Sequence, residues 1–479
     1  MDTTAPIIQQ HELTSRCNNA CAFCYNPERS ITAFTPRSGD RELNLRVAQT
    51  SVERGVMAVC PTGGEPLLVG DHLFEILDIY HQAGCYTSLN SNGRLVTPEV
   101  GKRLVISGLN SALISLHGLG ELHDQMVGVS GAFGETWRGL NLFREFGIAV
   151  TPNFVATAKN LHGLESVGQR LIEAGFKTMT VTPFLPSWGS KSHEMFLLER
   201  DHYRLYFQSI RNLRRQGLRI DSTLPIPPCV LIRYFPENWM EFLEVVSPRV
   251  CMAGRSFGVV SPDGQFRACI QAPYLSKFGG SVLENYRESW LAANKWAASE
   301  LLPDECWQEN SCAALAVCGG GCRTSCLWEN QGKAKGRTMY MGEPLSLEIA
   351  KPFLDRARFE IEYEAGKTFQ LRPQIRVRNE GWGLIVFNPA LQSFAVLSAE
   401  AEKFLIPGRK LNISSPKLAK VLLAIQAIES SEDKLGLDQA IPEPKVLPGK
   451  IFLPRLARGL EDQTAVYCLR ADTGERYFF

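Results

Sequence analysis

The chain has 479 residues, of which 44% are hydrophobic and 21% are charged, as in soluble globular proteins with two or three domains. Its formal net charge of +1 gives no electrostatic reason to expect nucleic acid or an anionic membrane as a partner. No apolar run reaches the roughly 18 residues that span a bilayer. The first residues, MDTTAPIIQQHELT, lack the basic and apolar regions of a secretory signal, so we expect a cytoplasmic protein.

The expected elements begin with alternating short apolar runs and helical patterns from residue 6 to about residue 216. The expected strands are Ile7–Leu13, Val56–Cys60, Tyr86–Asn90, Ala112–Leu116, Ala149–Ala156 and Thr178–Pro183. The expected helices are Leu43–Arg54, His72–Ala83, Pro98–Ser107, Glu135–Phe146, Leu161–Ala174 and Glu199–Gln216. These repeats predict an α/β fold with a parallel sheet, either an incomplete barrel or a doubly wound sheet. In parallel barrels the chemistry occurs at the C-terminal ends of the strands.

Cysteine is distributed unevenly along the chain. Of the 14 cysteines, three lie near the N-terminus and seven lie between positions 251 and 326. Without an export signal we expect a reducing compartment, where clustered cysteines bind metal more often than they form disulfides. For the isolated Cys60, Cys85 and Cys468, a free buried thiol is the simpler interpretation.

The loop after the first expected strand reads CNNACAFCY, which places Cys17, Cys21 and Cys24 in a C-x3-C-x2-C spacing. Three thiolates suit a [4Fe–4S] cluster whose fourth iron is open to a substrate or cofactor. A zinc site needs a fourth ligand nearby. His11 is available, although it lies on the first expected strand.

Further motifs follow the next strands in order: TGGEPLL, NSNG, SLHG and then HDQMVGVSGAF. Together with the cysteine loop, they resemble the radical S-adenosylmethionine (SAM) superfamily over about residues 5–220. The resemblance implies a partial (β/α)6 TIM barrel in which Cys17, Cys21 and Cys24 hold a [4Fe–4S] cluster that binds SAM. One-electron reduction then cleaves SAM to a 5′-deoxyadenosyl radical, which abstracts hydrogen from a substrate.

The same resemblance implies the residues that contact SAM. Glycines let a backbone approach a ligand closely, and Glu65 or exposed carbonyls can accept from the SAM ammonium group. The implied cofactor contacts are Phe23, Gly63, Gly64, Glu65, Pro66, Asn90, Asn92 and Ser115. His117 stands where many relatives carry an acid. No catalytic acid or base is identified, because His117, Asp124 and Tyr25 near the site can equally be structural hydrogen-bonding groups.

The second group of cysteines lies in a glycine-rich segment that opens with an expected hairpin, FGVVSPDGQFRACI. Its C-x12-G-x4-C and C-x5-C-x3-C spacings resemble the SPASM domain of radical SAM peptide maturases, with departures at Cys306 and Cys326. The resemblance implies auxiliary iron–sulfur cluster I at Cys251, Cys269 and Cys322, and cluster II at Cys306, Cys312, Cys318 and Cys326. Cluster I then lacks one cysteine ligand. The alternatives for this position are Cys229, a non-cysteine group or a site open to substrate. A zinc ribbon is the alternative for this segment.

Residues from about 370 to 479 form a third expected unit. RVRNEGWGLIVFN predicts a strand pair, and SAEAEKFL and SPKLAKVLLAIQAIESSE predict helices with Ser N-caps. The pattern is similar to a PqqD-like, winged-helix element that adds an extended peptide to a strand edge. A structural cap is the simpler alternative. The expected domains are a barrel over 1–220, a linker and SPASM domain over 221–340, and an α+β domain over 341–479.

The resemblances imply an enzyme that modifies a ribosomally made precursor peptide by crosslinking, epimerisation or backbone excision. Such an enzyme needs an electron donor, such as flavodoxin or ferredoxin. A sulfatase-type maturase or a cofactor-biosynthesis enzyme is the second hypothesis. A non-catalytic, metal-stabilised peptide-binding protein is the third, and the intact CNNACAFCY and GGEP motifs argue against it.

Overall fold

The computed structural model describes most of the chain before residue 432 and two short C-terminal strands. The described residues are 3–26, 40–186, 194–222, 226–245, 251–272, 281–300, 312–322, 342–357, 368–389, 393–397, 401–402, 405, 410–412, 416–425, 427–431, 468–469 and 476–477. The chain divides into two compact units. The first consists of Asp2–Cys306 and Cys318–Pro344, and the second mainly of Trp307–Val317 and Leu345–Phe479.

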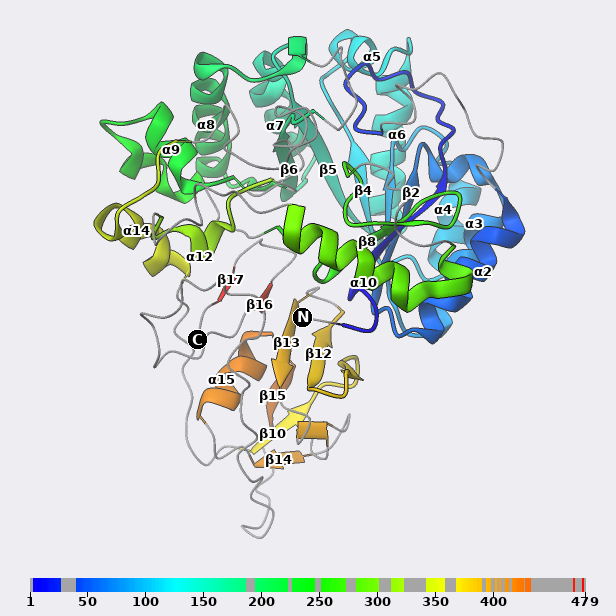
Figure 1. Ribbon diagram of the computed structural model, residues 1–479. Helices are drawn as coiled ribbons and strands as arrows, with labels where there is room; N and C mark the ends of the chain where they lie inside the picture. Colours follow the sequence, from blue (N-terminus) through cyan, green and yellow to red (C-terminus); the bar gives the residue numbers. More distant parts are fainter. Residues whose placement is uncertain are drawn as a thin grey trace. The chain divides into compact units, whose positions relative to one another are not determined.

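A nine-stranded sheet forms the centre of the first unit (Figure 1). Its strands are β1 Ile8–Thr14, β2 Ala58–Gly63, β3 Tyr86–Ser91, β4 Ser111–Ser115, β5 Ala149–Ala156, β6 Thr178–Pro183, β7 Arg219–Asp221, β8 Phe257–Val260 and β9 Phe266–Arg267. Strands β1 to β7 are parallel and pair in chain order, which confirms the predicted parallel α/β sheet. Strand order never reverses along these seven strands, so the doubly wound alternative is wrong.

The hairpin β8–β9 is present as predicted, but it also joins the main sheet, because β8 pairs in parallel with β1. The short strand β7 was not predicted either. Three residues carry too little periodic pattern to be recognised, and sequence alone does not indicate which strand a hairpin will pair with. Both additions extend the sheet beyond the six predicted strands.

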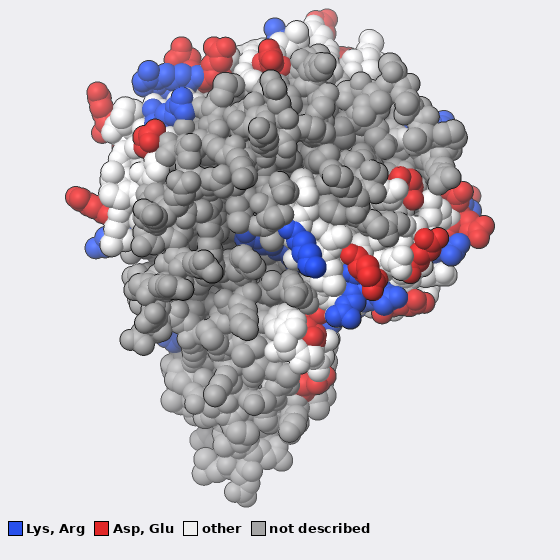
Figure 2. Space-filling view, in the orientation of Figure 1, with Lys and Arg blue, Asp and Glu red and all other residues white. Residues whose placement is uncertain are grey.

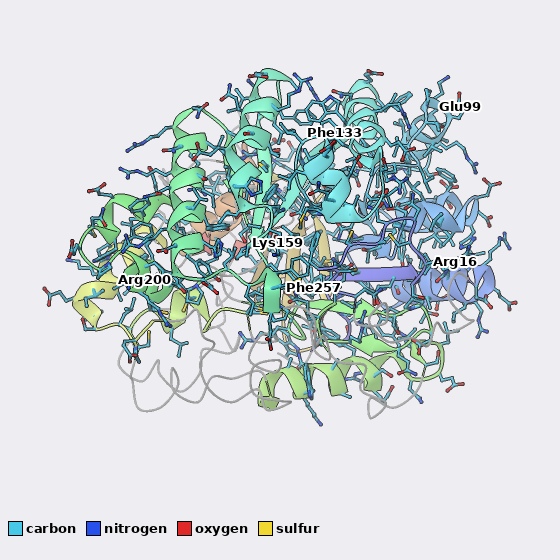
Figure 3. The ribbon with its side chains drawn as sticks, turned by 90° about the horizontal axis from the view of Figure 1, so that it is seen from above. Arg16, Glu99, Phe133, Lys159, Arg200 and Phe257 are labelled. Atoms are coloured by element: carbon cyan, nitrogen blue, oxygen red, sulfur yellow. The ribbon has the colours of Figure 1, made fainter. Side chains whose placement is uncertain are left out.

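Helices connect the parallel strands. They are α2 Arg41–Glu53, α3 His72–Gln82, α4 Pro98–Ile106, α5 Glu121–Val127, α6 Ala132–Glu145, α7 Leu164–Glu173 and α8 Arg200–Arg215. Seen from above, they follow an arc from Glu99 of α4 past Phe133 of α6 to Arg200 of α8 (Figure 3). The six predicted helices are present, with ends that differ by three residues or fewer. The short helix α5 was not predicted.

Further elements of the chain are η1 Pro66–Val69, η2 Leu161–Gly163, η3 Glu194–Phe196, α9 Pro228–Tyr234, η4 Trp239–Val245, α10 Val282–Glu300 and α12 Leu315–Cys318. The long helix α10 lies in the segment where only turns, a hairpin and cysteines were expected. It packs on the β8–β9 hairpin, where the fully buried Trp290 and Tyr286 contact Phe266. The segment after β8 is thus held to the first unit by an apolar core.

The two faces of the parallel sheet differ in chemistry. The face toward the helices is apolar and buried, with Leu89, Ala112, Ile114, Phe154 and Val181 each 3% exposed or less. Alternate residues on the other face are polar and partly exposed: Ser88, Asn90, Ser111, Ser115, Thr151, Asn153 and Thr178. This polar inner face leads to the carboxyl ends of the strands, where ligands bind in parallel α/β sheets.

The second unit contains small antiparallel sheets. Its elements are α14 Leu347–Ala357, β10 Thr368–Leu371, β11 Arg376–Asn379, β12 Leu384–Asn388, β13 Ser393–Leu397, β14 Lys410–Asn412, α15 Pro416–Ala424, β15 Ile428–Ser431, β16 Cys468–Leu469 and β17 Arg476–Tyr477. The predicted strand pair is confirmed as β11–β12, with Gly381 at φ 80° in the turn.

The predicted helix over SPKLAKVLLAIQAIESSE is correct only in its first half. After α15 the chain forms strand β15, which pairs antiparallel with β10 and places Ile428 opposite Leu371. Ladder hydrogen bonds and burial beside β10 outweigh the weak helical preference of this segment. Most of the predicted helix over SAEAEKFL lies outside the described residues, and a single helical hydrogen bond joins Leu405 to Ala401.

On the face in Figure 2, the described Lys and Arg side chains are interspersed with Asp and Glu. Within the described segments, no helix combines the length and hydropathy needed to cross a bilayer.

Helix α6 approaches the turn after β3 so closely that a side chain does not fit between them. A Cβ atom built at Gly139 lies 2.2 Å from the carbonyl oxygen of Gly93, whereas one built at Gly134 on the same helix meets nothing within 4 Å. Glycine at position 139 therefore permits the contact between α6 and the NSNG turn.

We predict that Gly139→Ala destabilises the protein by about 1–3 kcal/mol, because helix and turn must separate. Gly134→Ala is the matched control on α6 and should be neutral or more stable by about 0.5–1 kcal/mol, since alanine favours helix. Thermal unfolding of both variants measures the difference. Equal unfolding temperatures for the two variants would contradict the close contact.

Candidate functional site

Cys17, Cys21 and Cys24 lie on the loop that follows β1, and all three are partly exposed and outside any disulfide. The backbone N–H of Asn19 donates to the Cys17 sulfur at 3.4 Å, and the Asn92 side-chain amide lies 3.9 Å from the same atom. N–H groups directed at sulfur stabilise a thiolate and tune an iron–sulfur cluster. The surroundings of Cys17 therefore fit a metal-bound cysteine.

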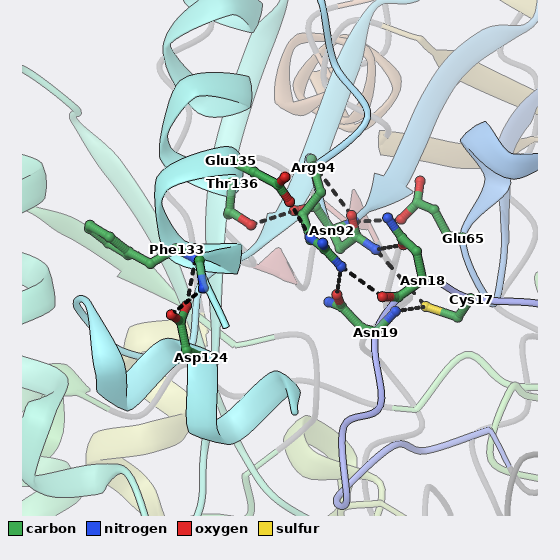
Figure 4. A network of polar contacts seen from close by, with 12 residues as sticks. Cys17, Asn18, Asn19, Glu65, Asn92, Arg94, Asp124, Phe133, Glu135 and Thr136 are labelled. Atoms are coloured by element: carbon green, nitrogen blue, oxygen red, sulfur yellow. Dashed lines mark hydrogen bonds and ion pairs between the residues drawn. The ribbon is translucent and has the colours of Figure 1, made fainter. Parts of the chain in front are cut away.

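Asn92 and Arg94 tie the turn after β3 to this cysteine loop (Figure 4). Asn92 Nδ2 donates to Asn18 Oδ1 at 2.6 Å. One Arg94 nitrogen donates to the Asn18 carbonyl at 2.7 Å and to Asn19 Oδ1 at 2.8 Å, while Arg94 Nε donates to Glu135 at 2.7 Å. Arg94 was not among the predicted site residues. Its position directly after NSNG was the only signal for it in the sequence.

Glu65 of TGGEPLL holds the same turn from the opposite side. Its buried carboxylate accepts hydrogen bonds from the Ser91 hydroxyl at 2.8 Å, the Asn92 N–H at 2.8 Å and the Leu67 N–H at 3.2 Å. Burial raises the pKa of Glu65 to about 7, although these hydrogen bonds act to lower it. In this arrangement Glu65 positions the Asn92 turn.

The two glycines of TGGEPLL let β2 approach the end of β1. A Cβ atom built at Gly64 lies 2.0 Å from the Arg16 carbonyl oxygen, and one at Gly63 lies 2.2 Å from that of Thr14. The Gly64 N–H donates to the Thr14 carbonyl at 2.6 Å. The close approach expected toward a ligand is therefore made here toward the start of the protein's own cysteine loop.

Phe23 lies in an apolar cluster beside the cysteine loop. It packs with Phe184 and Phe196 at ring distances of 6.5 and 6.0 Å and meets the His117 ring edge-on at 5.0 Å. Cys21 packs against the same cluster. This apolar wall excludes water from one side of the cysteine loop.

The other predicted SAM contacts lie at the same carboxyl edge of the sheet. Pro66 begins η1 directly after Glu65, whose side chain caps that turn. Asn90 and Ser115 are partly exposed on the polar inner face of β3 and β4. The structure thus brings the GGEP, NSNG and SLHG segments and the cysteine loop to one edge of the sheet, as their positions after successive strands predicted.

Asp124 has a structural role. Its carboxylate accepts the backbone N–H groups of Gly131 at 2.6 Å and Phe133 at 2.8 Å, at the start of α6 (Figure 4). These hydrogen bonds satisfy backbone donors at the helix N-terminus, where a negative charge is also favourable.

His117 is buried and neutral. Its Nδ1 accepts the Val155 N–H at 3.3 Å, so the neutral ring carries its proton on Nε2. Burial, and to a smaller extent the neighbouring His123, lower the pKa of His117 to about 3. His117 therefore offers an N–H donor at neutral pH and no positive charge.

His11 is not a ligand for the cysteine loop. It is buried on the helix-covered face of β1, where Nδ1 lies 3.1 Å from the Tyr80 hydroxyl of α3. Among the residues that the structure describes, no three His, Cys, Asp or Glu side chains are arranged tightly enough for one metal ion.

Cys251, Cys269 and Cys322 lie near one another in the first unit. Burial raises the pKa of Cys269 to about 12, and Cys251 and Cys322 raise it as well. The N–H of Gln271 donates to the Cys269 sulfur at 3.4 Å, and the N–H of Gly320 donates to the Cys318 sulfur at 3.4 Å. The donor is two residues after the cysteine in both cases, as it is at Cys17.

The remaining predicted metal ligands are described only in part. Cys312 is buried, and its sulfur accepts the Leu345 N–H at 3.4 Å. Cys229 lies on α9 and is partly exposed. Cys306 and Cys326 lie outside the described residues.

Comparison with known proteins agrees with this geometry. A family model described as the radical SAM superfamily matches residues 11–162, which include the cysteine loop and the motifs after β2, β3 and β4. Residues 11–162 of the chain therefore carry a radical SAM domain.

Two curated relatives of similar coverage have different named activities. The chain is 29% identical over 340 residues to a PqqA peptide cyclase of Ruegeria pomeroyi, a match that covers 68% of this chain and 85% of the relative. It is 25% identical over 327 residues to an AdoMet-dependent heme synthase of Nitratidesulfovibrio vulgaris, covering 65% of this chain and 86% of the relative.

Two solved structures share the fold. SuiB of Streptococcus suis, bound to S-adenosylmethionine, superposes with a TM-score of 0.54 and 17% identity over 71% of this chain and 77% of SuiB. The anSMEcpe structure with bound AdoMet superposes with a TM-score of 0.54 and 19% identity over 74% of this chain and 93% of that protein.

Glu65 predicts a pH dependence of stability. Because the folded protein raises the pKa of this carboxyl from 4.5 to about 7, the unfolded chain releases the proton at lower pH. Stability relative to Glu65→Gln should therefore fall as pH rises from about 5 to 7 and then level off. Thermal unfolding of the metal-free wild type and variant between pH 5 and 8 measures this, and a constant difference would contradict the raised pKa.

The contacts of Arg94 with the cysteine loop should help the loop to retain its metal. In Arg94→Lys the planar fork that reaches Asn18, Asn19 and Glu135 is lost, so the cysteine loop is held less firmly. We expect reconstituted protein to lose iron to a chelator severalfold faster. The control is Arg103→Lys, which changes an exposed pair with Asp71 and should release iron as the wild type does. Equal release from both variants would refute the role of Arg94.

Proposed function

We propose that this protein is a radical SAM enzyme that modifies a ribosomally synthesised precursor peptide. The observation that carries the proposal is the convergence of the cysteine loop with Glu65, Asn92 and Arg94 at the carboxyl edge of the sheet. The match to PqqA peptide cyclases supports a peptide substrate. Among the structures that share the fold, SuiB has been solved with its precursor peptide SuiA, and anSMEcpe with a peptide.

In this proposal Cys17, Cys21 and Cys24 hold a [4Fe–4S] cluster with one open iron position for SAM. The donors fit this group, because they are three thiols on one loop whose first sulfur receives N–H groups. When bound, the cluster and SAM supply the one-electron chemistry that begins hydrogen abstraction. The chain holds the loop through Arg94 and shields it through Phe23.

The SAM contacts remain those implied by the motifs: Phe23, Gly63, Gly64, Glu65, Pro66, Asn90, Asn92 and Ser115. Several of them are already used internally. Gly63 and Gly64 pack on the end of β1 and the start of the cysteine loop, Glu65 binds the Asn92 turn, and the Asn92 side chain donates to Asn18. We assign Glu65 chiefly a positioning role. Backbone groups near Glu65, together with Asn90 and Ser115 on the open inner face, would contact SAM directly.

We further propose a partial (β/α)6 barrel over residues 1–220, a linker and SPASM region over 221–340 and a C-terminal α+β domain over 341–479. Auxiliary cluster I would use Cys251, Cys269 and Cys322, which the fold brings near one another. Auxiliary cluster II would use Cys306, Cys312, Cys318 and Cys326. The enzyme would work in the cytoplasm with a reduced flavodoxin or ferredoxin as electron donor.

The C-terminal domain is proposed as a PqqD-like element that binds the leader part of the precursor peptide. The antiparallel sheet β11–β12–β13 supports this proposal, because β11 lies at its edge. An extended peptide that pairs with an edge strand gains main-chain hydrogen bonds without a deep pocket.

A small-molecule substrate is the second candidate function. The AdoMet-dependent heme synthases favour it, since their match covers almost the same share of this chain as that of the peptide cyclases. The two candidate functions can be distinguished by whether a precursor peptide or a small molecule increases the rate of SAM cleavage.

The test is SAM cleavage by anaerobically reconstituted protein. With a reductant, the wild type should release 5′-deoxyadenosine, and Cys24→Ser should reduce the rate at least roughly 100-fold, about 2.7 kcal/mol in activation free energy. Cys60→Ser changes a buried cysteine outside both groups and should retain activity. A precursor peptide, to be sought among short reading frames beside the gene, should be modified when it is added. Modification of a tetrapyrrole instead would favour the second candidate, and no SAM cleavage at all would refute the proposal.

A further inference from the structure

A buried ion pair joins β1 to the loop of Cys269. A terminal nitrogen of Arg267 donates to the Glu12 carboxylate, and the side chains are 0% and 1% exposed. Arg267 also donates to the Ile270 carbonyl at 3.2 Å. Burying two charges is costly, and apolar residues of similar size often give equal or greater stability. The pair is therefore better explained by a role in positioning or charge than by stability.

The pair lies between the two groups of cysteines of the first unit. Glu12 is opposite Thr62 in the β1–β2 register, directly before the glycines of TGGEPLL, and five positions before Cys17. Arg267 ends β9, two positions before Cys269. Strand β8 separates β1 from β9 in the sheet, so the two side chains meet across it.

A second contact attaches the Cys269 loop to another part of the sheet. Gln271 Nε2 donates to the Leu185 carbonyl at 3.4 Å, just after β6. The backbone N–H of Gln271 donates to the Cys269 sulfur, and its Oε1 lies 3.7 Å from the Cys322 sulfur. Four strands lie between β1 and β6, yet this one loop reaches the ends of both.

The pair is also linked to the N-terminal cysteine loop. Tyr25 follows Cys24, and its side chain interacts with Thr62. Thr62 therefore interacts with Tyr25 of the N-terminal cysteine loop and is the β2 register partner of Glu12, which pairs with Arg267.

We propose that Glu12 and Arg267 are positioning residues that fix auxiliary cluster I relative to the N-terminal cluster, and that Glu12 balances the charge of Arg267 beside cluster I. The inference rests on the proposed function, because it requires an iron–sulfur cluster at Cys269. Reduction adds negative charge to a cluster, so an unbalanced cation nearby favours the reduced form. With Glu12 in place, the pair is neutral and this effect is offset.

Removing Glu12 and removing Arg267 should affect the reduction potential of auxiliary cluster I differently. In Glu12→Gln the Arg267 guanidinium keeps its charge, because arginine does not deprotonate in proteins. In Arg267→Met the remaining buried Glu12 is expected to take up a proton and become neutral. The reduction potential of auxiliary cluster I should therefore rise in the first variant and change little in the second.

The experiment is an EPR-monitored redox titration of reconstituted full-length protein, with the cluster I signal identified by its loss in Cys269→Ser. Glu12→Gln should shift the reduction equilibrium at least tenfold, about 59 mV for one electron. The double variant Glu12→Gln/Arg267→Met should return close to the wild-type potential, and Glu12→Asp, which keeps the charge, should stay there. Glu75→Gln, which breaks an exposed pair with Arg41, is the control and should cause no shift.

The positioning role has a separate measurement that avoids a lone buried charge. In the double variant the two loops lose their tie, so pulsed EPR should show a broader distance distribution between the N-terminal cluster and auxiliary cluster I. An unchanged distribution would overturn the positioning role even if Glu12→Gln does not fold.

The outcomes separate the two proposals. If the wild type has no signal that Cys269→Ser removes, the proposed auxiliary cluster is wrong and this inference fails with it. If the signal is present but its potential is the same in Glu12→Gln, only the charge-balancing inference is overturned, and SAM cleavage at the N-terminal cluster is unaffected.

Discussion

The hydrogen-bonded fork of Arg94 is the interaction on which the site depends most. A loop with three thiols has no regular structure of its own, so its shape must come from its neighbours. Arg94 reaches Asn18 and Asn19 in that loop and is itself fixed by Glu135 of α6. Asn92 and Glu65 hold the turn that carries Arg94. The cysteines are thereby fixed before any cluster is bound, which lowers the entropic cost of assembling it.

Much of the first unit was predictable because its pattern is local and repeated. The alternation of strands and helices predicted the six strand–helix repeats, and the motifs after successive strands predicted one shared edge. The role of Glu65 was not predictable in the same way. Its carboxylate is turned to Ser91 and Asn92 of the protein, a detail that depends on how two turns pack.

Contacts distant in sequence account for what could not be predicted. Glu12 and Arg267 are 255 positions apart, and Arg267 occupies an unspecified position within the C-x12-G-x4-C spacing. Strand β15 is specified by pairing with β10 and replaces a helix that local preference favoured. Helix α10 was not predicted, because its segment was interpreted from its cysteines and glycine-rich turns. In each case long-range packing decided the outcome, and a single sequence carries little information about such packing.

The same hydrogen-bond geometry recurs at cysteines of both groups. At Cys17, Cys269 and Cys318 the backbone N–H two residues later points at the sulfur. This recurrence links the N-terminal loop, which lies within the radical SAM match, to the second group, whose clusters are proposed. Burial keeps the Cys269 thiol protonated without metal. The recurring N–H groups fit one chemistry for both groups, namely cysteines that would become thiolates when they bind metal.

The central claim is that Cys17, Cys21 and Cys24 hold a cluster with one iron open to SAM. The most direct measurement is the EPR spectrum of this reduced cluster with and without SAM. We expect SAM to change the spectrum, because the amino and carboxylate groups of SAM would bind the open iron. A spectrum that is identical with saturating SAM, or protein that binds zinc in place of iron, would contradict it.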